Sequence, residues 1–369
     1  MSDDSADYLE YTPAMDAAPK GEAETIDKIT AVLRFNNERA YRIYKRGVRD
    51  AHAKSHAVLR GELVVEPDLP PLLAQGMFAT ARSYPVIARM SSTSGAIRTD
   101  QTRGVRGLGI KVLGVEGDRA LPEDIATTQD FIMVTHREFL FKDAKDYLNR
   151  GMPIAFGLAR LSDPALRLGS WLLDGLNSNV LSKVGMNLPP SLMVFVRANT
   201  HILGETFHTS APLRYGKHIV KMRYVPASPE VRALIDMPTD DHPGVNAFQE
   251  MVIDFFSQHE AVYELQAQFC TNEKDMPIED ATVEWKDTES PYRTVATIRY
   301  PVQDPYTPER RAYGDDVLSF NSWRSIDAHR PLGSINRLKL KVYEASSNFR
   351  HQVNNAPRVE PSEVSDLPV

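Results

Sequence analysis

Hydrophobic residues change their spacing along the chain, and the change predicts where helix gives way to strand. Between about residue 25 and residue 46 they recur every three or four positions, as in an amphipathic helix that ends near Gly47. These positions are Ile26, Ile29, Val32, Leu33, Ala40 and Tyr44. Beyond Gly47 the spacing becomes two, so apolar and polar residues alternate, as on strands with one buried face.

This alternation marks a series of strands. It is clearest at 57–63, 86–90 and 108–112, where the polar positions include Arg60, Arg89 and Lys111. Further strands are expected at Phe131–Thr135, His218–Val225, Tyr263–Phe269 and Thr294–Tyr300. Because no helix regularly separates these segments, the sheet should be mainly antiparallel and closed as a barrel. The predicted fold class is therefore α+β, with one antiparallel β-barrel and surrounding helices.

Helices and tails account for the rest of the chain. Leucines interrupted by glycine and proline across 143–195 indicate short helices lying over the barrel. Near the end of the chain, Ser334 could cap a helix with one apolar face, formed by Ile335, Leu338, Val342, Ala345 and Phe349. Residues 1–24 and 356–369 are polar or proline-containing and predict loose tails, which leaves 25–355 as a single domain.

Composition excludes several classes of protein. A net charge of -6 gives no reason to expect nucleic acid or an anionic membrane as a partner. The one cysteine, Cys270, excludes an internal disulfide and is typical of a reducing compartment. The acidic start of the chain lacks the features of a secretory signal, and no apolar run is long enough to span a bilayer. These features predict a cytoplasmic protein without a transmembrane segment.

Three segments carry candidate chemistry, and they occur in the order Arg49-Asp-Ala-His52-Ala-Lys54, Pro85-Val-Ile-Ala-Arg89-Met-Ser91 and Arg106-Gly107-Leu-Gly-Ile-Lys111. Together they resemble the haem-pocket motifs of the catalase superfamily. The resemblance runs from about Asn36 to about Arg350. It includes a Tyr215-Gly216-Lys-His218 strand and a His329-Arg-Pro-Leu-Gly333 stretch.

The resemblance implies haem as cofactor and a peroxide as substrate. The apolar region 156–195 could shape an entrance wide enough for an organic hydroperoxide, although helix packing against the barrel explains the same residues. His52 would stand over the iron and move a proton between the two peroxide oxygens, which a neutral imidazole near its ordinary pKa can do. Ser91 could bond the far ring nitrogen and fix the tautomer. Arg49 and Arg89 would pair with haem propionates, because the guanidinium fork matches a carboxylate.

Other residues are implied as contacts of the macrocycle. Phe131 and Phe141 could pack on it, although aromatic residues on strands are commonly core. The counterpart of His218 in the family lies on the proximal side of the haem. Arg324 is a further candidate, because it falls in the stretch before His329.

Two partners that the family provides are missing from their expected places. The axial ligand of the family is a tyrosinate a few residues before the His-Arg…Leu-Gly stretch, yet no tyrosine occurs between Ser319 and His329. The distal asparagine of the family is likewise absent near Ala126 and Thr127. His329 is the first candidate for a substitute ligand, since neutral imidazole is a common ligand of haem iron. His218 is a weaker candidate, and the third possibility is an open or water-occupied position. Alternatively, His329 matches a non-ligating histidine of the family and bonds to backbone.

The sequence thus favours a haem protein with peroxidase-like or hydroperoxide-metabolising activity that could assemble as a homo-oligomer. Two other interpretations stay open. One is a non-catalytic haem carrier or sensor. The other is a haem-free descendant of the fold that serves as a binding or scaffold protein.

Overall fold

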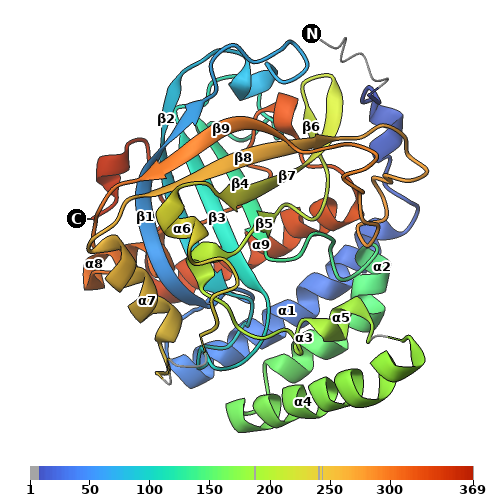
Figure 1. Ribbon diagram of the computed structural model, residues 1–369, viewed down its shortest axis with the longest axis vertical. Helices are drawn as coiled ribbons and strands as arrows, with labels where there is room; N and C mark the ends of the chain where they lie inside the picture. The colour runs from blue at the N-terminus through green and yellow to red at the C-terminus, as the bar shows by residue number, and fades with distance from the viewer. Residues whose placement is uncertain (1–7, 187, 240–241, 243, 369) are drawn as a thin grey trace.

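The computed structural model describes residues 8–186, 188–239, 242 and 244–368, so residues 1–7 and 369 of the expected tails lie outside the described residues. Its centre is a closed antiparallel barrel (Figure 1). The strands are β1 Lys54–Val65, β2 Ser83–Ser92, β3 Arg106–Leu113, β4 Thr128–Val134, β5 Phe207–His208, β6 Leu213–Tyr215, β7 His218–Pro226, β8 Ala261–Phe269 and β9 Arg293–Tyr300. Neighbours run in the order β5-β4-β3-β2-β1-β9-β8-β7-β6, and pairing of β5 with β7 closes the ring.

The alternating pattern decides which side chains fill the barrel. Leu59, Ala88, Ile110 and Phe131 belong to one buried hydrophobic cluster. Arg89, in register with Gly109 of β3, takes the opposite face of β2. The predicted antiparallel barrel is confirmed. The short strands β5 and β6 were not predicted, because two or three residues are too few to show a period.

Helices pack around the barrel. The chain forms α1 Glu22–Tyr44, α2 Ala144–Asp146, α3 Met152–Leu158, α4 Asp163–Leu176, α5 Pro190–Met193, α6 Pro229–Arg232, α7 Ala247–Phe256, α8 Pro308–Ala312 and α9 Ser334–Asn354. The two long helices, α1 and α9, pack against each other beside the barrel (Figure 1). In the part of the chain that the structure describes, no helix combines the length and apolarity needed to cross a bilayer.

The start of α9 differs from the sequence prediction. Ser334 is the first residue of the helix, and its hydroxyl accepts the Ala144 backbone N–H at 3.0 Å instead of capping α9. Glu279 takes over part of the capping, since its carboxylate accepts the Ser334 backbone N–H at 3.2 Å. The predicted cap was therefore wrong, because a carboxylate distant in sequence reaches this helix end.

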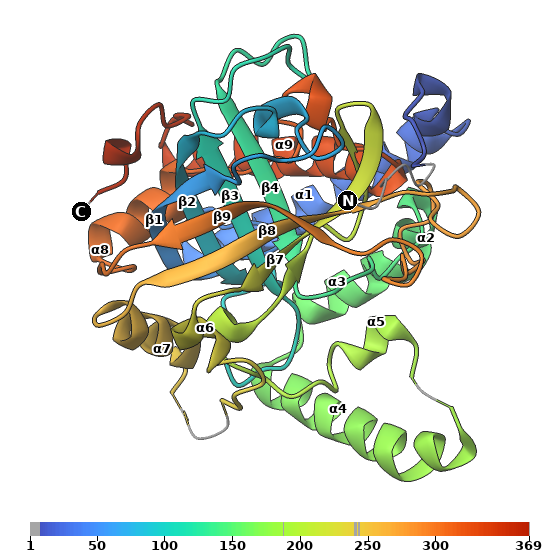
Figure 2. The ribbon, with the colours of Figure 1, turned by 45° about the horizontal axis from the view of Figure 1, so that its top comes forward.

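Both terminal segments contact the barrel where loose tails were expected. Leu9 donates its backbone N–H to the Cys270 carbonyl at 2.9 Å. At the other end Leu367 is buried, and the Pro368 carbonyl accepts a hydrogen bond from Arg310 at 2.8 Å. In the middle of the chain, α4 extends away from the barrel instead of lying over it (Figure 2).

Candidate functional site

His52 lies in the turn that precedes β1 and is held there by its backbone. Its φ of 58° is in the left-handed region, which a histidine seldom adopts. Arg89 of β2 donates to the His52 carbonyl at 3.1 Å. The imidazole packs directly on Gly107 of β3, where a Cβ atom would lie 2.2 Å from the ring. Glycine is therefore required at position 107 for the ring to take this place.

Ser91 of β2 gives the ring a defined tautomer. Its Oγ lies 3.1 Å from Nδ1 of His52, and its hydroxyl can donate to the Gly107 carbonyl at 3.3 Å. If the single hydroxyl proton goes to that carbonyl, Oγ accepts from Nδ1–H and leaves Nε2 as the basic nitrogen. Burial, together with the charges of Arg89 and Arg49, lowers the pKa of His52 to about 3. The imidazole is therefore neutral near pH 7.

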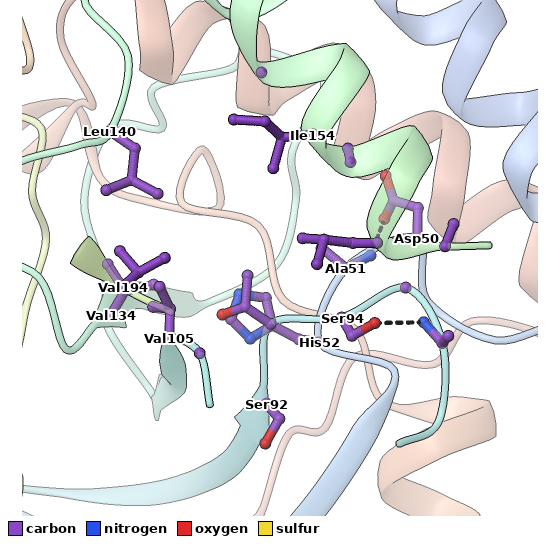
Figure 3. A pocket seen from close by; sticks show the side chains of 18 of the residues that line it. Asp50, Ala51, His52, Ser92, Ser94, Val105, Val134, Leu140, Ile154 and Val194 are labelled. Atoms are coloured by element: carbon purple, nitrogen blue, oxygen red, sulfur yellow. Dashed lines mark hydrogen bonds between the residues drawn. The ribbon is translucent and has the colours of Figure 1, made fainter. Parts of the chain in front are cut away.

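Two adjoining cavities border His52. The large cavity, of about 280 Å³, extends between α1, α3 and α9 and has a mostly apolar wall. In Figure 3 the imidazole stands at this wall, with Leu140 and Ile154 across the hollow. The small cavity, of about 90 Å³, lies between the barrel and α9. The residues that line both cavities are Asp50, Ala51, His52, Ile132 and Tyr343.

Tyr343, which the sequence analysis missed, comes from α9. Burial raises the pKa of its phenol, and the nearby Asp50 and Tyr147 raise it further. Ser346, Ser347 and Arg350 follow Tyr343 along the helix and also line the small cavity. Three to four residues separate neighbours on one side of a helix, so Tyr343, Ser346 and Arg350 form a polar stripe. That spacing is the signal that could have identified them.

Four arginines gather at the far side of the small cavity. This arginine cluster consists of Arg46, Arg49, Arg89 and Arg350. Asp315 and Asp316 are its carboxylate partners, and Asp50 adds a third carboxyl close enough to feel the charge of Arg49. Burial would raise the pKa of Asp315, but Arg89 and Arg49 outweigh it and lower that pKa. Burial also lowers the pKa of Arg49, and repulsion from Arg89 and Arg350 adds to the shift. The cluster therefore has more cations than anions.

The hydrogen bonds of the cluster hold the segment before Ser319. Arg49 donates to the carbonyls of Gly314 and Leu318 at 2.8 and 2.7 Å. Arg89 reaches the Asp315 carboxylate at 3.0 Å, and Arg350 reaches the Leu318 carbonyl at 3.1 Å. Each guanidinium keeps further N–H groups beyond these bonds, because it carries five.

Arg324 belongs to a different group of charges, here termed the lysine network, which consists of Lys111, Asp130, Arg324 and Glu360. Lys111 lies 2.6 Å from Asp130 and 2.8 Å from Glu360, and Arg324 lies 2.7 Å from Glu360. Two cations thus meet two anions, and none of the four lines either cavity beside His52. The predicted contact between Arg324 and the cofactor has no support from this placement.

The other predicted contacts of the cofactor also differ in whether they line one of the two cavities. Phe141 lines the large cavity, whereas Phe131 lies inside the barrel. His218 packs edge-on against Phe269 and lines neither cavity. Nε2 of His329 accepts the Met77 backbone N–H at 3.1 Å, and this ring also lines neither cavity. That bond occupies Nε2 and matches the interpretation in which His329 bonds to backbone.

The fold thus brings Arg49, His52, Arg89 and Ser91 together. It does not bring Phe131, His218, Arg324 or His329 to the same hollows. The distal asparagine of the family was expected near Ala126 and Thr127, and these two residues line neither cavity. An asparagine from another element, Asn37 of α1, lines the large cavity.

Neither a protein-family model nor a curated protein matches the chain. Solved structures of catalases, however, are similar to it. The chain is similar to a bacterial catalase, with a TM-score of 0.57 and 13% identity over 96% of this chain and 66% of that one. It is also similar to a fungal catalase, with a TM-score of 0.55 and 15% identity over 89% of this chain and 68% of that one. Catalase A from Saccharomyces cerevisiae matches with a TM-score of 0.58 and 14% identity over 96% of this chain and 72% of that one. The chain therefore has a catalase-like fold and spans about two thirds of these catalases.

Proposed function

We propose that this protein binds haem across the two cavities and uses it to react with hydroperoxides. The observation that carries the proposal is that His52 and Tyr343 each border both cavities, so one planar ligand could lie between them. The catalase-like fold supports the proposal. The hollow beside His52 is the place that we infer for such a ligand.

The residues present suit the polar and metal-binding parts of haem. The surplus of positive charge around Arg49, Arg89 and Arg350 suits two propionates, because their carboxylate partners are fewer than the buried cations. The Tyr343 phenol offers an axial oxygen, and tyrosine is one of the known ligands of haem iron. Since burial raises the pKa of Tyr343, ligation would release its proton, and haem affinity should increase with pH.

Bound haem would supply the iron at which a hydroperoxide is reduced and its O–O bond is broken. His52 would accept the hydroperoxide proton on Nε2 and deliver it to the departing oxygen. Ser91 would keep Nδ1 protonated throughout, so that Nε2 stays the working nitrogen. Arg89 would hold the turn through the His52 carbonyl. The low pKa of His52 keeps the base unprotonated at neutral pH.

The shape of the large cavity favours an organic hydroperoxide over hydrogen peroxide. Side chains of three helices give it an apolar wall, among them Leu33, Ile154 and Leu338. Hydrogen peroxide offers no apolar surface to bury against such a wall, whereas an alkyl hydroperoxide does. We therefore expect a higher kcat/KM for an alkyl hydroperoxide such as cumene hydroperoxide.

Spectroscopy tests the proposal. The purified protein, supplied with haemin, should give a Soret band and the charge-transfer absorption of a ferric tyrosinate. Tyr343→Phe should remove the tyrosinate signature. Tyr147→Phe is the matched control, because Tyr147 is another partly buried tyrosine that lines the large cavity, and its loss should leave the spectrum unchanged. A wild-type spectrum retained in Tyr343→Phe would exclude Tyr343 as the ligand.

A second candidate is a haem-free binding protein. The Phe320 ring lies against Gly109 of β3 and narrows the small cavity to about 90 Å³, which favours an occupant smaller than haem. The same experiment separates the two candidates, because a haem-free protein shows no Soret band after incubation with haemin. If haem binds but hydroperoxide is not consumed, the protein is a carrier or sensor.

A further inference from the structure

An apolar arm extends from the molecule beside the large cavity. It comprises α4, the π-helical turn Asn177–Leu181, the 3-10 turn Ser182–Val184 and the residues next to them, from 161 to 186. Figure 2 shows α4 separated from the barrel. The arm exposes eight large hydrophobic side chains, which are Leu161, Leu168, Trp171, Leu172, Leu176, Val180, Val184 and Met186. Trp171 alone is 70% exposed.

These side chains form a continuous stripe. From Leu168 to Val184 they recur every fourth residue, and residues four apart are neighbours on a helix surface. Isolated exposed hydrophobic residues need no explanation, but a contiguous patch marks an interaction surface. The opposite side of α4 faces the molecule, since Leu166 of α4 and Leu158 of α3 line the large hollow. The arm therefore lies next to the cavity that borders His52.

The arm and the residues bordering it carry a surplus of positive charge, although the net charge of the chain is -6. Residues 161–186 hold two acids and two cations, and arginines from outside the arm add to the positive side. The two acids of the arm are already paired, Asp163 with Arg98 at 2.6 Å and Asp174 with Arg103 at 3.0 Å. Three further cations, Arg160, Arg167 and Lys183, have no acidic partner among the residues that the structure describes. The arm thus combines an apolar stripe with surplus cations.

We propose that this arm docks on an anionic lipid surface. The leucines and valines of the stripe enter the boundary between headgroups and acyl chains, and the Trp171 indole lies at headgroup level. Arg160, Arg167 and Lys183 contact lipid phosphates, each adding to the attraction of an anionic leaflet. The charge favours lipid over a second copy of this chain, because two equal arms would bring like charges together.

Vesicle binding tests the proposal, and it requires no haem. The full chain should co-sediment with vesicles of phosphatidylcholine and phosphatidylglycerol, and much less with phosphatidylcholine alone. Binding should weaken with added salt. Tryptophan emission should shift to shorter wavelength on binding, and this reports Trp171, because Trp285 and Trp323 are buried already. Leu168→Asp/Leu172→Asp should lower the partition coefficient by more than about tenfold.

The matched control is Ile125→Asp/Val359→Asp, which changes two exposed hydrophobic residues outside the arm and should leave vesicle binding unchanged. Circular dichroism should show native helix content in both variants, since all four positions are exposed. An absence of vesicle binding would overturn the proposal. So would a wild-type dimer in light scattering that Leu168→Asp/Leu172→Asp converts to monomer, because a second copy would then cover the arm. Equal binding to phosphatidylcholine alone would overturn the role of charge.

Discussion

Two groups of buried charge lie on the outer face of the same barrel wall, and they differ in balance. In the lysine network, Lys111 and Arg324 meet Asp130 and Glu360, and neither cavity touches them. In the arginine cluster, four guanidinium groups meet the carboxylates of Asp315 and Asp316 and the nearby carboxyl of Asp50, and three of the arginines line the small cavity.

The difference separates a structural group of charges from a candidate binding site. A balanced buried network satisfies its own members, and breaking it leaves an uncompensated charge. A surplus of buried cations next to a hollow is costly without an anion from outside the chain. By this criterion Arg324 is structural, whereas Arg49, Arg89 and Arg350 are candidates for ligand binding.

The largest expected effect concerns chemistry at the hollow. With haem bound, His52→Ala should slow the reaction with hydroperoxide by roughly two to four orders of magnitude, the usual contribution of a positioned acid–base group. Haem content should be unchanged, because His52 is not the proposed ligand. Stopped-flow absorbance measures the rate, with His259→Ala, an exposed histidine, as control. An unchanged rate in His52→Ala would show that another group moves the proton.

Removing one cation should destabilise the lysine network more than the arginine cluster, as measured by the free energy of unfolding. Lys111→Met should lower the free energy of unfolding by about 3–5 kcal/mol, because Asp130 and Glu360 then share only Arg324. Arg350→Met should cost less, because it relieves repulsion with Arg89 and no carboxylate loses its ion pair, although the carbonyls of Asp315, Asp316 and Leu318 each lose a donor. Urea unfolding of the haem-free protein measures both. Equal losses would contradict the distinction between balanced and surplus charge.

The smallest effect concerns pH. His52 has a pKa of about 3 when folded and an ordinary value of 6.5, so below pH 6.5 the unfolded chain binds a proton that the folded chain does not. Stability should therefore fall as pH decreases from 6.5 towards 3. His52→Ala should remove about 2 kcal/mol of the stability difference between pH 7 and pH 5. Urea unfolding at both values checks this, and an unaltered difference would mean that His52 titrates normally in the folded protein.

The alternation of apolar residues and the sequence motifs were sufficient to predict the barrel, but not all residues of the candidate site. Alternation predicted the strands that carry Arg89 and Lys111, because the side chains of a strand point to opposite faces. It could not tell that one of these residues borders a hollow and the other a closed network. The resemblance places the axial ligand in the residues before Leu332 and Gly333. Tyr343 lies after them, on a helix that had been predicted only by its apolar face.

By itself the sequence determined the α+β barrel, the position of its longest strands, and a histidine, a serine and two arginines within three short segments. The barrel and its strands follow from the spacing of apolar residues, whereas the four site residues follow from the resemblance of the three segments to a known family. Only the tertiary structure placed α9 against α1, so that Tyr343 and Arg350 meet residues about 300 positions earlier. Only the tertiary structure showed that His329 and Arg324 lie away from both cavities, where His329 accepts the Met77 backbone N–H and Arg324 donates to the Ser319 carbonyl. The physical reason is that a side chain's partners depend on which surfaces pack together, and a local pattern in the chain does not encode that choice.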